Sequence, residues 1–193
     1  MNINRLKAAL FLLALYPLAR LLVLAFSDGL GANPIEFITR STGTWTLVGL
    51  MLTLTVTPLR KITGWHQLLR IRRMLGLFSF FYASLHFITY IWLDQFFDFS
   101  AILHDIYKRP FITVGFVAFL LLIPLALTSS NAMIRRLGAL RWQKLHKLVY
   151  LIAILGVLHY IWLVKKDLTQ PLIYATVLTL LLGWRVWNAQ KVK

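Results

Sequence analysis

The sequence predicts an all-α fold: a polytopic membrane bundle of six transmembrane helices, forming one domain over residues 1–193. Of the 193 residues, 59% are hydrophobic and only 14% are charged, and the mean hydropathy is +0.72. A soluble domain of this size cannot bury so much apolar surface. Long uncharged runs recur along the chain, and about 20 apolar residues suffice to cross a hydrocarbon core about 30 Å thick. These observations together indicate a membrane protein without a soluble module.

The expected helices follow the apolar runs in order. The first is a membrane span rather than a cleaved signal peptide, because its apolar stretch is long and contains Arg20. The segment SDGLGANPIEFITRSTG after it is expected to be a loop, since Gly, Pro and Asn mark irregular backbone. The second and fourth runs, LVGLMLTLTVTPL and VGFVAFLLLIPLAL, carry no charge and no strict alternation of the strand type. The third and fifth each follow a basic cluster and contain a histidine. The expected helices span about residues 6–26, 43–60, 74–93, 111–128, 145–164 and 171–187.

The charges predict the orientation of the bundle in the membrane. Most of the 21 Lys and Arg residues lie at one set of helix ends, around residues 5–7, 60–73, 135–147 and 185–193. The six acidic residues all lie at the opposite ends: Asp28, Glu36, Asp94, Asp98, Asp105 and Asp167. Basic loops favour the cytoplasmic side, so both termini are expected to be cytoplasmic. This pattern explains the net charge of +15 better than a nucleic-acid partner does. The absence of cysteine excludes disulfides and iron–sulfur clusters.

Two histidines are expected deep in the membrane at matching depth. His86 lies about 12 residues into the third helix, roughly 18 Å deep, and His159 about 14 residues into the fifth, roughly 21 Å deep. Both helices run in the same direction, so the two side chains reach the outer half of the bilayer. Two neutral imidazoles on neighbouring helices can supply both axial ligands of a haem. The alternative is that each histidine only makes a hydrogen bond between helices.

A third histidine, His146, lies at the basic mouth of the fifth helix. It precedes His159 by 13 residues, a rotation of about 220°, so the two side chains point to different faces. A second bis-histidine haem would need a partner near position 72 or 73, where the sequence has Arg72 and Arg73, so none is predicted. His146 could bind a haem with another sixth ligand, contact a flavin or quinone, or be an interfacial residue.

The arginines before the third and fifth helices are candidate anion ligands. Guanidinium forks suit phosphates and carboxylates, so Arg72, Arg73 and Arg141 could hold a flavin phosphate, a quinone or a haem propionate. The alternative role is topology and attraction to anionic membrane lipids. Arg20 either extends to the outer surface or pairs with a propionate. His66 and His104 are expected to be solvated.

Four segments of the chain carry a family resemblance. They are RRMLGLFSFFYASLHFITYIWLDQ, KRPFITVGF, LTSSNAMIRRLG and RWQKLHKLVYLIAILGVLHYIWLVKK. They closely resemble the MsrQ (formerly YedZ) family, the haem-binding membrane subunits of periplasmic methionine sulfoxide reductase systems. The resemblance extends over nearly the whole chain. This family is part of the ferric-reductase-like transmembrane group, which includes the membrane part of NADPH oxidases.

The resemblance implies a function and a set of cofactors. It implies a multi-pass protein of the bacterial inner membrane that passes electrons from the quinone pool, or from a cytosolic flavin reductase, to a periplasmic molybdopterin enzyme, MsrP. That partner reduces methionine sulfoxide in oxidised envelope proteins, so this chain would be an electron-transfer subunit rather than the catalytic one. The implied cofactors are haem b and FMN. The family's histidines match His86, His146 and His159, whereas the wider group usually has two histidines on each of two haem helices.

The predicted depth of the haem adds the need for an inner carrier. A haem at His86 and His159 leaves roughly 20 Å to the cytoplasmic surface. We therefore expect FMN, quinone or a haem at His146 among Arg72, Arg73 and Arg141. A rival function is a stand-alone ferric or oxygen reductase, although no GxGxxG nucleotide motif is present. Another is a proton-coupled transporter, which predicts acids inside the membrane.

Overall fold

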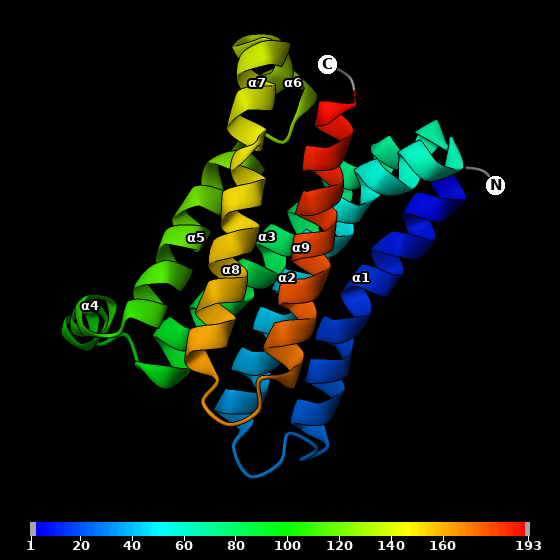
Figure 1. Ribbon diagram of the computed structural model, residues 1–193. Helices are drawn as coiled ribbons and strands as arrows, with labels where there is room; N and C mark the ends of the chain where they lie inside the picture. The colour runs from blue at the N-terminus through cyan, green and yellow to red at the C-terminus, as the bar shows by residue number, and fades with distance from the viewer. Residues whose placement is uncertain (1–2, 192–193) are drawn as a thin grey trace.

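The computed structural model describes residues 3–191 and is helical throughout its regular structure, without strands in this range. Six helical spans are long and apolar enough to cross a membrane, as the sequence predicts (Figure 1). In chain order the elements are α1 (Ile3–Phe26), α2 (Pro34–Thr63), the short turn η1 (His66–Leu68), α3 (Leu69–Thr89), the π-helical turn η2 (Tyr90–Asp94), α4 (Phe99–Lys108), α5 (Pro110–Leu127), α6 (Asn131–Leu137), α7 (Ala139–His146), α8 (Leu148–Leu163) and α9 (Thr169–Gln190).

The two ends of the bundle differ in charge. The start of α1, the end of α9 and the helices α6 and α7 lie at one end, the upper end in Figure 1. We call it the basic end, because the predicted basic clusters all lie there. The opposite end, which we call the acidic end, carries the α1–α2 loop, α4 and the α8–α9 loop, and with them all six acidic residues. The sequence predicts that both termini are cytoplasmic. The terminal residues 1–2 and 192–193 lie outside the described range, so this stays a prediction.

Helix α2 begins at Pro34, well before the expected start near residue 43. Asn33 caps this helix: its side-chain oxygen accepts the N–H of Glu36 at 3.2 Å, and Pro34 occupies the first turn. Asn at the N-cap and Pro just inside the helix are both favourable there. The extra turns bring Thr39, Arg40 and Gly43 to the wall of the cavity described below.

The long span through residues 139–163 is broken once. Helix α7 ends at His146 and α8 begins at Leu148, with Lys147 between them. The other segments expected as loops contain short helices, α4 at the acidic end and α6 at the basic end.

Helices α2 and α3 approach so closely that only small side chains fit between them. A Cβ at Gly49 would lie 2.5 Å from Oγ and 3.3 Å from Cα of Ser79. Ser79 is fully buried and donates its hydroxyl to the carbonyl of Leu75 at 2.9 Å. Small residues allow such backbone proximity in membranes. The α2–α3 pair forms one wall of the bundle and the α5–α8 pair the other.

A proline inside α2 creates a backbone defect that α9 repairs. Pro58 has no N–H, so the carbonyl of Leu54, one turn earlier, lacks its helical donor. Arg185 of α9 donates a guanidinium N–H to this carbonyl and a second one to Leu181 O at 2.8 Å. The same guanidinium lies 5.4 Å from the ring centre of Tyr150 on α8. One side chain thus joins three helices near the basic end.

We expect Arg185→Met to lower the free energy of unfolding by about 1–3 kcal/mol, the cost of leaving a buried acceptor unpaired. The loss should be smaller in a Pro58→Ala background, because the restored N–H at position 58 can then bond to Leu54 O. Thermal unfolding in detergent, followed by circular dichroism, measures both values. An equal loss in the two backgrounds would show that Arg185 acts through other contacts.

Candidate functional site

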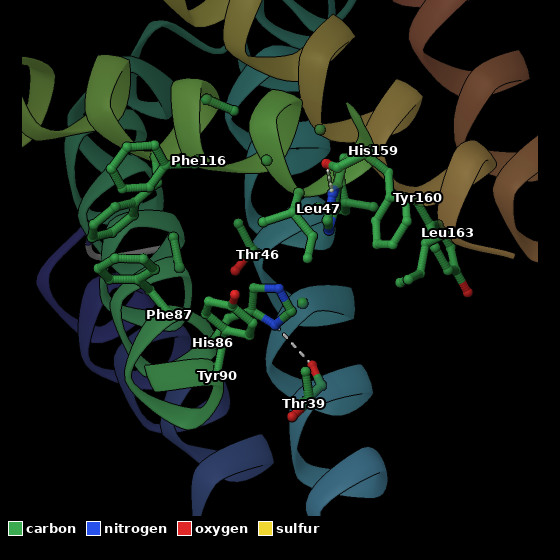
Figure 2. A pocket seen from close by; sticks show the side chains of 18 of the residues that line it. Thr39, Thr46, Leu47, His86, Phe87, Tyr90, Phe116, His159, Tyr160 and Leu163 are labelled. Atoms are coloured by element: carbon green, nitrogen blue, oxygen red, sulfur yellow. Dashed lines mark hydrogen bonds between the residues drawn. The ribbon is translucent and has the colours of Figure 1, made fainter. Parts of the chain in front are cut away.

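A cavity of about 350 Å³ lies between α2, α3, α5 and α8, and both deep histidines line it (Figure 2). Its inner part is apolar, with leucines and an isoleucine from three of the helices: Leu47, Leu50, Leu122 and Ile152. Toward the acidic end the lining becomes polar and includes Thr39, Arg40, Tyr90, Asp94 and Arg109. The cavity is therefore an apolar chamber with a charged mouth.

The rings of His86 and His159 lie across the cavity from each other. Their centres are 6.2 Å apart and their planes are nearly perpendicular, at 78°. Nδ1 of His86 is 2.9 Å from the carbonyl oxygen of Thr39, and Nδ1 of His159 is 2.7 Å from that of Phe111. A carbonyl oxygen can only accept, so each Nδ1 carries the proton and each Nε2 keeps a free lone pair. Metal-binding histidines are held in this way, with the second nitrogen donating to a carbonyl or carboxylate.

Each histidine reaches its carbonyl across a glycine. Thr39 lies one helical turn before Gly43 on α2, and Phe111 one turn before Gly115 on α5. A Cβ at Gly43 would lie 3.1 Å from Cε1 of His86, and a Cβ at Gly115 only 2.7 Å from Nδ1 of His159. The two helices thus offer bare backbone where the rings pack.

None of Thr39, Gly43, Phe111 and Gly115 is among the site residues predicted from the sequence. The two glycines themselves are a signal in the sequence. A glycine inside a helix costs about 1 kcal/mol relative to alanine, so its presence calls for a packing or functional reason.

The spacing of the two rings fits one metal ion between them. With a nitrogen–metal distance of about 2 Å and a ring centre about 1 Å behind each nitrogen, the two centres would be about 6 Å apart, against 6.2 Å here. No cluster of three or more His, Cys, Asp or Glu able to hold a metal occurs within residues 3–191. The remaining ligands would have to come from a prosthetic group, and a haem supplies its own equatorial nitrogens. The chamber is in the size range of cofactor pockets, so the residues present fit a haem.

Two arginines at the mouth of the cavity are paired with acids. Arg40 contacts Glu36 at 2.6 Å, and both side chains are largely exposed. Arg109 Nε lies 3.2 Å from Oδ1 of Asp105, a residue of α4 that is only 7% exposed. Five guanidinium donors are available to each arginine, so donors remain for another anion.

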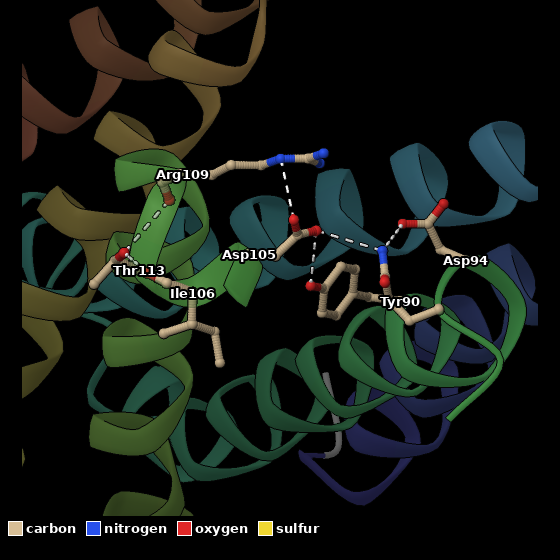
Figure 3. Close-up of polar contacts among 7 residues, drawn as sticks. Tyr90, Asp94, Asp105, Ile106, Arg109 and Thr113 are labelled. Atoms are coloured by element: carbon tan, nitrogen blue, oxygen red, sulfur yellow. Dashed lines mark hydrogen bonds and ion pairs between the residues drawn. The ribbon is translucent and has the colours of Figure 1, made fainter. Parts of the chain in front are cut away.

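Asp105 is the centre of a polar network that fixes α4 beside the cavity (Figure 3). Its Oδ2 accepts from the Tyr90 hydroxyl at 3.3 Å and from Gln95 Nε2 at 3.4 Å. The hydroxyl of Thr113 on α5 donates to the carbonyl of Ile106 on α4. The network links α4 to the η2 turn and to α5, and it holds the Arg109 side chain at the mouth.

His146 lies at the basic end, outside this cavity. Its ring stacks on Trp142, with centres 3.9 Å apart, and its Nε2 is 3.0 Å from Oγ1 of Thr128. That hydroxyl already donates to Pro124 O at 2.6 Å. It therefore accepts from His146, whose Nδ1 is then the unprotonated nitrogen.

The predicted arginine ligands are distributed over different surfaces. Arg72 is within electrostatic range of His146, Tyr150 and Arg185, and Arg73 is also within range of His146. Arg73, the next residue, is exposed and lines a groove between α1 and α3. Arg141 is exposed on α7.

Arg20, His66 and His104 are all exposed. Arg20 lies outside the lining of the cavity and over the ring of Phe37, 5.9 Å from its centre. His66 and His104 are exposed, as expected.

Comparison with known proteins gives a consistent result. Residues 42–157 match the family described as "Ferric reductase like transmembrane component", a match that ends two residues before His159. The chain is 63% identical over 186 residues to a protein of Azospira oryzae, covering 96% of this chain and 80% of that protein. It is 58% identical over 193 residues to one of Herminiimonas arsenicoxydans, covering 98% and 88%, and 53% identical over 180 residues to one of Rhodospirillum rubrum, covering 93% and 86%. All three are named "Protein-methionine-sulfoxide reductase heme-binding subunit MsrQ".

Proposed function

Because the chain belongs to the ferric reductase-like transmembrane family, and within it to the MsrQ heme-binding subunits of protein-methionine-sulfoxide reductases, we propose that it carries electrons across a bacterial inner membrane to a periplasmic MsrP-type methionine sulfoxide reductase. The observation that supports this best is the His86–His159 pair. Both rings are held by backbone carbonyls, 6.2 Å apart across an apolar chamber.

In this proposal His86 and His159 would hold a b-type haem, each through its Nε2. A bound haem supplies one-electron chemistry by cycling between ferric and ferrous iron. The hydrogen bonds from Nδ1 to Thr39 O and Phe111 O fix the tautomer and the orientation of both imidazoles, and they increase the basicity of Nε2. The surrounding leucines limit access of water, which together with ligand basicity tunes the reduction potential.

The polarity of the chamber suggests how the porphyrin is oriented. Its apolar edge would enter the leucine-lined part, and its two propionates would face the mouth, where Arg40 and Arg109 have unused donors. This orientation brings the polar edge toward the acidic end, which in this proposal faces the periplasm, as the charge distribution favours.

Electrons must also enter at the basic end. We propose FMN or a quinone as the inner carrier near Arg72 and His146, with the quinone pool or a cytosolic flavin reductase as the donor. The cationic surroundings of His146 favour a phosphate or a reduced quinone there. Reduction of methionine sulfoxide to methionine and water consumes two electrons and two protons, so the subunit would deliver two electrons one at a time.

A spectroscopic experiment tests the proposal. We expect the purified protein in lipid nanodiscs to show a Soret band, with α and β bands that appear on reduction by dithionite. Purified MsrP-type partner with methionine sulfoxide should then reoxidise the haem under anaerobic conditions, whereas partner without sulfoxide should do so only to a limited extent. A colourless protein would refute haem binding. Reoxidation by ferric iron or oxygen, but not by the partner, would favour the stand-alone reductase.

A further inference from the structure

A second hollow in the structure, of about 720 Å³, is a groove between α1 and α3 at the basic end. Three lining residues are cationic: Lys7 from α1, and Arg70 and Arg73 from α3. The remaining lining residues are all apolar, among them Phe11 and Leu77. The groove is separate from the haem chamber, with which it shares no lining residue.

The groove is charged at one end and apolar along the rest of its length. Along α1 the lining residues Lys7, Phe11 and Leu15 are each one turn apart, so the groove runs about 12 Å toward the bilayer centre. Phe11 packs edge-to-face on Phe78 of α3, with ring centres 5.2 Å apart. Just beyond this pair, the buried Tyr82 donates its hydroxyl to Ala14 O at 2.6 Å and joins the two helices. The groove therefore has a definite polar entrance and apolar wall.

We propose that this groove binds an anionic phospholipid, with its phosphate between Lys7, Arg70 and Arg73 and an acyl chain along the aromatic wall. The charges are complementary, because the lining contains no acidic residue and all six acids of the chain lie at the acidic end. Basic pockets between membrane helices bind such head groups, and arginine forks match phosphate oxygens.

A quinol fits this groove less well. Oxidation of a quinol releases two protons, and a site for that reaction needs a group that can accept them. The groove is lined by charged Lys and Arg side chains and by apolar side chains only, none of which is a proton acceptor. A bound phospholipid would instead fill the space between α1 and α3, and so hold α1 against the bundle.

Native mass spectrometry of the full-length protein in detergent tests this proposal, with cardiolipin and phosphatidylethanolamine as the added lipids. We expect cardiolipin to bind at least about tenfold more tightly. The triple variant Lys7→Gln/Arg70→Gln/Arg73→Gln should weaken cardiolipin binding by roughly a hundredfold, as three lost phosphate contacts imply. The matched control, Arg135→Gln/Arg136→Gln/Lys144→Gln, removes equal charge from exposed residues of α6 and α7 at the same end and should bind like the unmodified protein.

A second variant separates the groove from general charge effects. Leu77→Trp narrows the apolar part of the groove and leaves all three cations in place. It should also weaken cardiolipin binding. Gel filtration and circular dichroism verify that each variant is folded. Equal weakening by the groove and control triple variants, equal affinity for the two lipids, or displacement of cardiolipin by ubiquinone would overturn the proposal. None of these measurements depends on haem, so their outcome is independent of the proposed electron transfer.

Discussion

Replacing His159 with alanine is expected to remove most of the haem from the purified protein. The substitution deletes one of the two histidines that line the chamber, and it removes the side-chain hydrogen bond to the Phe111 carbonyl. Substitutions in the supporting shell of metal sites already cost about 10–100-fold in affinity, so loss of a ligand should cost at least that much. The ratio of haem to protein, measured as the pyridine haemochrome, should fall below about one tenth. His86→Ala should behave in the same way.

Two variants make this experiment specific. His104→Ala changes an exposed histidine of α4 and should retain the full haem content. His159→Met keeps a ligand for iron, and it should retain haem while raising the midpoint potential, because methionine as an axial ligand raises it. A full complement of haem in both alanine variants would show that the cofactor lies elsewhere in the bundle.

Gly115→Ala is expected to impair haem binding almost as severely, although residue 115 is not a ligand. The new Cβ would lie 2.7 Å from Nδ1 and 2.9 Å from Cε1 of His159, closer than such atoms can approach. The ring must then move, which breaks its 2.7 Å hydrogen bond to Phe111 O and turns Nε2 away from the iron. We expect haem affinity to fall by about 10–100-fold, measured by titration of haem into the apoprotein.

The other glycines provide graded controls for this effect. Gly43→Ala brings a Cβ to 3.1 Å from the His86 ring, so a smaller loss is expected. Gly183→Ala makes the same substitution in α9, where a new Cβ meets no atom within 4 Å, and haem affinity should be unchanged. Equal affinities for all three variants would mean that the close contact between glycine and histidine has no role in binding.

The sequence predicts the fold well, because hydropathy alone identifies six spans in a chain of this composition. It also predicts that His86 and His159 lie at a similar depth in the membrane, since the rise per residue is the same in both helices. The sequence does not reveal which face of α2 or α5 each histidine ring packs against. The role of Gly43 and Gly115 therefore could not be predicted from it. The early start of α2 was missed because Asn33 and Pro34 fit a loop as well as a helix cap.

The predicted arginine set illustrates a different limit. Arg72 and Arg73 are adjacent in sequence, so the sequence predicts one shared role for both. Successive residues of a helix differ by about 100° in direction. Both arginines are within electrostatic range of His146, but Arg72 is half-buried near Tyr150 and Arg185, whereas Arg73 is exposed in the groove between α1 and α3. The role of Arg185 could not be predicted from the sequence, because its side chain bonds to a carbonyl 131 residues away. Only the tertiary structure reveals this pairing.

The link between Arg185 and Leu54 O has a consequence for biogenesis. Ribosomes add roughly 5–20 residues per second, so α9 emerges on the order of ten seconds after the Pro58 turn of α2 has been made. Throughout that interval the nascent chain in the membrane has an acceptor that its own helix cannot satisfy. Synthesis of α9 therefore supplies the closing contact of α2, and maturation of this part of the bundle waits until α9 has been made.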